Sequence, residues 1–92
     1  MVNLLSDSEI NSYLSQLPDW KLEEKTIKRT FVWQDFITAI DFVNKLVAPA
    51  EAAQHHPDIK IVYNQVTINL TTHDVGGLTI LDIEMAKIIN SL

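Results

Sequence analysis

The 92-residue chain contains no cysteine, which excludes disulfide bonds and catalysis by a thiol. It also lacks a cluster of basic residues. Seven Lys and Arg stand against twelve Asp and Glu, for a formal charge of −5, and the one adjacent basic pair is Lys28-Arg29. Because binding to a phosphate backbone needs basic clusters, we expect no direct nucleic-acid partner.

Long apolar runs are missing as well. No stretch approaches the roughly 20 apolar residues of a membrane span, and the N-terminus lacks the basic start and apolar run of a signal peptide. We therefore expect a cytoplasmic protein without a membrane partner. The length predicts one compact domain over residues 1–92. Such a chain buries only roughly 60–65% of its unfolded surface, so we expect it to gain stability by association.

The N-terminal third predicts a short helix and two strands. Ser6 and Glu9 have the spacing of a capping box, and the apolar residues that follow repeat at helical spacing until Pro18-Asp19. Residues 20–32 alternate between apolar and charged side chains, with a turn near Glu24-Lys25, and predict two short strands.

A long amphipathic helix is predicted from Gln34 to about His55, where Pro57 ends it. Pro49 lies inside this segment. An interior proline removes one backbone hydrogen bond and clashes with the preceding turn. We therefore expect a kink or a local break around Lys45 to Pro49, and not the end of the helix.

The C-terminal third predicts a hairpin and a final helix. Residues 59–63 and 65–71 alternate, and Asn64 between them tolerates the left-handed conformation of a tight turn. Gly76-Gly77 allow a loop with positive φ. The last helix is expected to open near Thr79 and to bury Leu81, Met85 and Ile88.

The predicted order of elements is therefore α-β-β-α-β-β-α. Two hairpins separated by a long helix indicate an α+β fold, with a four-stranded antiparallel sheet and helices packed on one face.

All three histidines of the chain lie within 19 residues. His55 and His56 end the long predicted helix, and His73 follows the last predicted strand. Histidine both donates and accepts protons near pH 7. Glu51 lies four residues before His55, so on a helix a carboxylate–imidazole contact is expected. The pattern predicts a proton-transfer site, provided that the fold brings His73 next to the other two.

The histidines are part of a longer signature, which reads Glu51-x3-His55-His56-Pro57-x5-Tyr63-x9-His73-x8-Asp82. Segments outside it extend the pattern over nearly the whole chain: Trp20, Val47-Ala48, Tyr63-Asn64-Gln65-Val66 and Gly76-Gly77-Leu78-Thr79. Together these residues resemble the pterin-4a-carbinolamine dehydratases, also called dimerisation cofactors of a homeodomain transcription factor.

The resemblance implies a hydro-lyase that converts 4a-hydroxytetrahydrobiopterin to quinonoid dihydrobiopterin and water. The substrate is the spent cofactor of aromatic amino-acid hydroxylases, and the product is returned to tetrahydrobiopterin by a reductase. Expelling hydroxide from the 4a carbon needs a proton on the departing oxygen, and a ring nitrogen must lose one as the C=N bond forms. Two groups that titrate near neutrality can do both without a metal or cofactor.

The resemblance also assigns roles to single residues. His55 and His73 are expected to be the acid/base pair that flanks the ring. His56 belongs to the same catalytic site and is expected mainly to hold the pterin. The other expected pterin contacts are Pro57 and the backbone around Thr72 and Asp74.

Two carboxylates, Glu51 and Asp82, are expected to contact the histidines and not the pterin itself. Thr79-x-x-Asp82 is itself a capping-box pattern. Asp82 is therefore expected to cap the last helix, to support the site, or to do both.

A zinc site is the alternative use of the histidines, because imidazole is a common zinc ligand. Adjacent histidines rarely converge on one ion, however, and the usual His-x3-His spacing of a helix is absent. We therefore expect no metal.

Two other functions remain open for the same fold: a protein-binding or assembly module, and a dehydratase for another pterin, such as a molybdopterin-related compound. A homodimer or homotetramer is expected. The strand at residues 65–71 alternates cleanly and has no proline to blunt an exposed edge, so it is predicted to pair with its copy in a second subunit. The long helix offers a second surface, as it does in the family.

Overall fold

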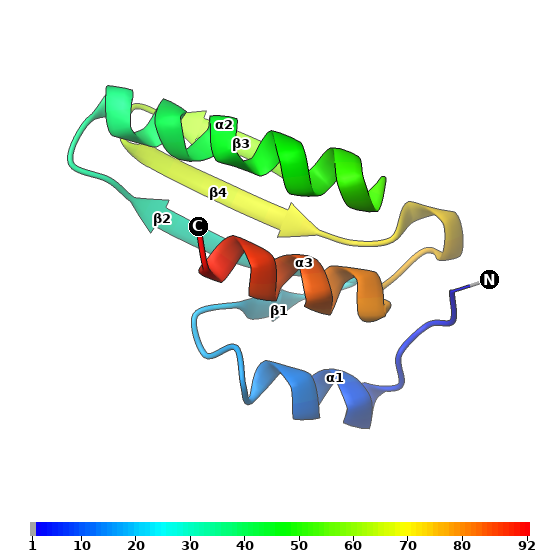
Figure 1. Cartoon of the computed structure of the whole chain (residues 1–92). Helices are drawn as coiled ribbons and strands as arrows, with labels where there is room; N and C mark the ends of the chain where they lie inside the picture. The colour runs from blue at the N-terminus through cyan, green and yellow to red at the C-terminus, as the bar shows by residue number, and fades with distance from the viewer. Residues whose placement is uncertain (1) are drawn as a thin grey trace.

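The computed structural model describes residues 2–92 and has the predicted order of elements (Figure 1). Three helices accompany a four-stranded antiparallel sheet, which makes the fold α+β. The helices are α1 (Asp7–Leu14), α2 (Phe36–Ala53) and α3 (Ile80–Asn90). The strands are β1 (Lys21–Glu23), β2 (Thr26–Val32), β3 (Asp58–Val62) and β4 (Gln65–Leu70), and a short 3-10 helix, η1 (His73–Val75), joins β4 to α3.

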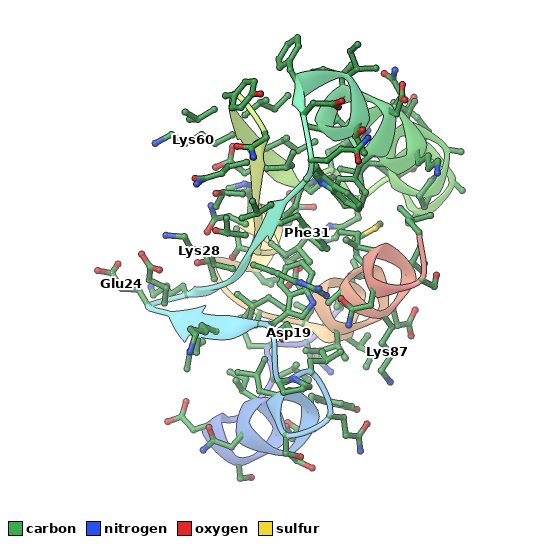
Figure 2. All side chains as sticks on the ribbon, turned by 90° about the vertical axis from the view of Figure 1, so that its left-hand side faces the viewer. Asp19, Glu24, Lys28, Phe31, Lys60 and Lys87 are labelled. Carbon is green, nitrogen blue, oxygen red and sulfur yellow. The ribbon has the colours of Figure 1, made fainter. Side chains whose placement is uncertain are left out.

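The helices form one layer on the sheet. Figure 1 shows α2 and α3 over the sheet, with α1 next to β1 and α3. Lys28 and Lys60 lie on the other side of the sheet in Figure 2, away from α2 and α3. The apolar core lies between the sheet and the helices, and its fully buried side chains include Ile27, Val66, Ile68, Leu70, Ile83 and Ile89.

β4 is a central strand, and the prediction that it forms a free edge is wrong. It pairs with β2 on one side and with β3 on the other, in the order β1-β2-β4-β3. Burial explains this placement, because alternate residues of β4 are fully buried whereas most of β3 is exposed. The edges of the sheet are therefore the three-residue β1 and the largely exposed β3.

α2 continues through Pro49 without the expected local break. Figure 1 shows no sharp bend at this point. Leu46 and Ala50 lie on either side of Pro49, and both are buried in the protein. We attribute the continuity to this packing, which holds the two halves of the helix on one line despite the missing hydrogen bond.

Both hairpins place an unexpected residue in the left-handed conformation. The first turn falls at Glu24-Lys25, as predicted, and the second at Tyr63-Asn64, where Tyr63 was expected in the strand. The positive φ belongs to Glu24 (57°) and Tyr63 (51°), and not to Asn64. Asn64 is held by Trp33 at the end of β2. The side-chain Nδ2 of Asn64 donates to the backbone carbonyl of Trp33, and the backbone carbonyl of Asn64 accepts from the backbone amide of Trp33, both at 2.8 Å.

The helix ends match the sequence signals closely. Ser6 and Glu9 form a capping box at α1, and Thr79 and Asp82 form one at α3. Met85 is buried as predicted, but Ile88 is 38% exposed and Leu81 is half-buried. The buried face of α3 is Asp82, Ile83, Met85, Ala86 and Ile89. No helix within residues 2–92 is both long and apolar enough to cross a membrane.

The cap of α2 gives the fold a pH-dependent contribution. Asp35 accepts a hydrogen bond from the amide of Thr38 at 2.8 Å, and this bond lowers the pKa of the Asp35 carboxyl below its ordinary value of 3.8. A carboxyl with a lowered pKa in the folded state stabilises the fold above its unfolded pKa, and that contribution is lost as the pH falls through the folded pKa.

We predict that Asp35→Asn removes this pH dependence and retains the cap, because an asparagine oxygen also accepts the bond. The measurement is thermal unfolding of both proteins from pH 7 to pH 2.5. The difference in Tm between the unmodified protein and Asp35→Asn should shrink as the pH falls. A difference that stays constant over this range would contradict the assignment, and Asp35→Ala, which removes the cap at every pH, is the control.

Candidate functional site

The C-terminus of α2 turns the two adjacent histidines in opposite directions. Gln54 follows the helix with φ 50°, in the left-handed region. Its amide bonds to the carbonyl of Glu51 at 3.2 Å, and the amide of His55 bonds to the carbonyl of Ala50 at 3.1 Å. This pair of bonds is a Schellman motif. The left-handed conformation costs a residue with a side chain about 1–2 kcal/mol, so contacts beyond the turn must hold it.

His55 supplies such a contact by pointing into the protein. It is 8% exposed, and its Nε2 lies 2.6 Å from Oδ1 of Asp82, which is fully buried. The predicted contact between Glu51 and His55 does not form. Its premise was that both residues lie on one helix, whereas the left-handed turn at Gln54 takes His55 off the face that carries Glu51.

His56 is the partner of Glu51. Its Nε2 bonds to Oε2 of the carboxylate, and both side chains are more than half exposed. Each histidine at the end of α2 therefore has a carboxylate partner, one buried and one at the surface.

Asp82 caps α3 and holds His55 at the same time. Oδ2 accepts from the backbone amide of Thr79 at 3.0 Å, which closes the capping box, and from the hydroxyl of Thr72 at 2.8 Å. Oδ1 is left for His55. A buried carboxylate needs several donors to offset its desolvation, and these three contacts supply them.

His73 lies at the start of η1, in the connection from β4 to α3, and its side chain is exposed. Backbone bonds within the connection hold the loop. The amide of Thr72 donates to the carbonyl of Gly77 at 2.9 Å, and the carbonyl of Thr72 accepts from the amide of Gly76 at 3.0 Å. Gly76 ends η1 with φ 71°, as the sequence predicted for this loop.

One pocket brings the three histidines together. It has a volume of about 240 Å³ and is lined by Gln54, His55, His56, Thr71, Thr72, His73, Asp74 and Leu81. A hollow of about 380 Å³ shares three of these residues and is otherwise lined by Val2 and Val75. The walls of these two spaces therefore come from the segment after α2, the end of β4 with η1, and the first turn of α3.

Three of the expected site residues do not line this pocket: Asp82, which is buried behind His55, and Glu51 and Pro57. Glu51 and Pro57 line a neighbouring apolar groove of about 160 Å³, which also includes His56. Gln54 and Thr71 line the pocket but were not singled out in the sequence. Each directly precedes a predicted site residue, His55 and Thr72 respectively. This adjacency is the one sequence signal that points to them.

The carboxylates and histidines do not converge as metal ligands. Within residues 2–92, no three His, Asp or Glu side chains are grouped so that they could hold an ion. His55 faces a buried carboxylate, whereas His56 faces one at the surface.

Comparison with known proteins places the chain in a family. Residues 3–92 match the family model described as "Pterin 4 alpha carbinolamine dehydratase". Two relatives carry the name "Putative pterin-4-alpha-carbinolamine dehydratase". The protein from Cyanothece sp. is 61% identical over all of this chain and 95% of its own length. The protein from Picosynechococcus sp. is 56% identical over the whole of both chains.

A solved structure agrees with this assignment. The "Crystal structure of transcriptional coactivator/pterin dehydratase from Brucella Melitensis" is similar with a TM-score of 0.93 and 38% sequence identity, over 97% of each chain. Family model, full-length relatives and fold lead to one conclusion. The chain belongs to the pterin-4-alpha-carbinolamine dehydratase family of hydro-lyases.

Proposed function

We propose that the chain dehydrates 4a-hydroxytetrahydrobiopterin to quinonoid dihydrobiopterin and water, by histidine general acid/base catalysis, in the recycling of tetrahydrobiopterin. The observation that carries this proposal is the convergence of all three histidines on one pocket, from segments that are distant in the sequence. The cytoplasmic location and the single domain expected from the sequence stay predictions.

The reaction needs two proton transfers. The bond from C4a to oxygen breaks as the hydroxyl receives a proton and leaves as water, and a ring nitrogen gives up a proton as the C=N bond forms. No net proton is consumed. A residue that donates in one step and a residue that accepts in the other must therefore flank the ring, and histidine suits both roles near pH 7.

We assign these steps to His55 and His73. Nε2–H of His55 donates a hydrogen bond to the carboxylate of Asp82, so the other ring nitrogen, Nδ1, is the one that can exchange a proton with a bound molecule. Within residues 2–92, Nε2 is the ring nitrogen of His55 that is hydrogen-bonded, and His55 lines the pocket. His73 lines the same pocket from η1 and is exposed to solvent. Its imidazole can therefore exchange a proton with water after each turnover.

His56 is assigned to holding the pterin, because its bond to Glu51 orients the ring from the surface side. The pocket of about 240 Å³ is smaller than most ligand sites. The adjoining hollow shares Thr72, Asp74 and Leu81 with it, and extends the space available to a bound molecule. We place the side chain of the pterin there.

The hollow is lined by the apolar Val2, Val75 and Leu81 and by the polar Thr72 and Asp74. This mixed lining has no feature that selects the dihydroxypropyl chain of biopterin over the side chain of another pterin. A different pterin, such as a molybdopterin-related compound, is therefore the alternative substrate for the same chemistry.

We also propose that the chain forms a homodimer or homotetramer. Exposed apolar side chains gather where β2 and β3 both pair with Gln65 of β4: Val32 is 66% exposed and Val62 56%. Ile37 and Val47 of α2 are 71% and 58% exposed. The β3 edge and the outer face of α2 are thus two candidate interfaces, which a protein partner could also use.

We predict that the purified protein accelerates dehydration of chemically prepared 4a-hydroxytetrahydrobiopterin, followed by ultraviolet absorbance, and that a chelator leaves the rate unchanged. A molybdopterin-related 4a-hydroxypterin, assayed in parallel, decides between the two substrates. Folded protein that accelerates neither compound would contradict the enzymatic proposal and favour the protein-binding module.

We predict that His55→Ala and His73→Ala each lower kcat about 10²–10⁴-fold, the contribution typical of one positioned acid or base. His56→Ala should raise KM more than it lowers kcat, because we assign this residue to binding. Circular dichroism and sedimentation control for fold and assembly. Near-normal turnover by the His55 or His73 variant would refute the role given to that residue.

We predict that the protein sediments as a dimer or larger species at micromolar concentration. Ile37→Lys and Val62→Lys each place a charge in one candidate interface, and the variant that lowers the sedimented mass identifies the interface in use. A monomer in the unmodified protein at this concentration would contradict the proposed assembly.

A further inference from the structure

A directed series of hydrogen bonds links the first turn of α3 to His55. The amide of Leu81 lies 3.2 Å from the hydroxyl oxygen of Thr79, which lies 2.8 Å from the hydroxyl oxygen of Thr72. The hydroxyl of Thr72 lies 2.8 Å from Oδ2 of Asp82, and Oδ1 of the same carboxylate faces Nε2 of His55. Apart from the amide of Leu81, every member of the series is buried.

The direction of each bond follows from the number of protons available. A backbone amide can only donate, so the hydroxyl oxygen of Thr79 accepts from Leu81 and its own proton is free to donate to Thr72. A hydroxyl has one proton, and that of Thr72 goes to the carboxylate of Asp82, which accepts only. Asp82 then has one oxygen occupied by Thr72 and the amide of Thr79, and the other oxygen is directed at His55.

Thr72 is placed to act through Asp82 and not on a substrate. Its side chain is 6% exposed, and its hydroxyl is already shared between Thr79 and Asp82. Its amide and carbonyl are also occupied by bonds to the loop that ends at Gly77. Thr72 borders the pocket, but its hydrogen-bonding groups are engaged within the protein.

We propose that Thr72 is a positioning residue for His55. Its hydroxyl fixes the orientation of the Asp82 carboxylate, and the carboxylate keeps the His55 proton on Nε2, so that Nδ1 serves the pocket. Thr72 also directly precedes His73, and its place in the series ties the loop that carries His73 to the carboxylate that holds His55. The effect of Thr72 on turnover rests on the proposed function, whereas its effect on the His55 ring does not.

The test uses the full-length chain with ¹⁵N-labelled histidine. Thr72→Val removes the hydroxyl and keeps the branched shape, whereas Thr72→Ser keeps the hydroxyl. Thr67→Val is the matched control, because Thr67 lies on β4, the strand that leads to Thr72, and its hydroxyl bonds to that of Thr30 at 3.1 Å, outside the pocket. The readouts are the exchange rate of the His55 Nε2–H proton with water, and kcat and KM for the pterin.

In the unmodified protein, Thr72→Ser and Thr67→Val, we expect a slowly exchanging Nε2–H proton on His55. In Thr72→Val we expect that proton to exchange at least about tenfold faster, and kcat to fall about ten- to a hundredfold with little change in KM, as for the loss of one hydrogen bond to a charged group. Serine should restore both values. An unchanged exchange rate in a folded Thr72→Val protein would overturn the proposal.

Two further outcomes separate this proposal from the proposed function. If Thr72→Val changes the His55 signal while even the unmodified protein fails to dehydrate the pterin, the positioning role stands and the proposed function fails. If Thr72→Val does not fold, Thr72→Ala repeats the test without the branched side chain. Should neither variant fold while Thr67→Val does, the hydroxyl serves stability alone and the positioning role is overturned.

Discussion

A single buried carboxylate, that of Asp82, joins three separate segments of the chain. It accepts hydrogen bonds from His55 after α2, from Thr72 after β4 and from the amide of Thr79 at the start of α3. A buried charge that loses its partners is strongly destabilising, so these segments must be in place together. The same constraint builds the pocket, because it fixes one histidine and anchors the loop that carries another.

Much of the fold could be predicted from local patterns in the sequence. The capping boxes at Ser6 and Thr79 and the turn at Glu24-Lys25 were placed correctly, and the turn at Asn64 to within one residue, because each depends on neighbours within a few residues. The order of the strands could not be read in this way. It depends on which strand buries more apolar surface, and both strands of the second hairpin alternate in sequence.

The candidate site, too, was predictable in part. Clustering of the histidines in the sequence predicted one region, and the structure brings all three to one pocket. The carboxylate partners were less predictable. Spacing on an ideal helix paired Glu51 with His55, but the left-handed Gln54 rotates the chain before His55 and gives Glu51 to His56 instead. Glutamine carries no sequence signal for that conformation, which is usually taken by glycine.

The junction between α2 and α3 has a consequence for how the protein can be stabilised. The contact from His55 to Asp82 spans 27 residues and closes only when both helices are docked on the sheet. A loosely packed chain that retains its helices and strands has no such pocket. A ligand of the pocket therefore binds the native state selectively and shifts the folding equilibrium by mass action. Under the proposed function, a tight pterin analogue would stabilise the folded state in this way, including in destabilised variants far from the histidines.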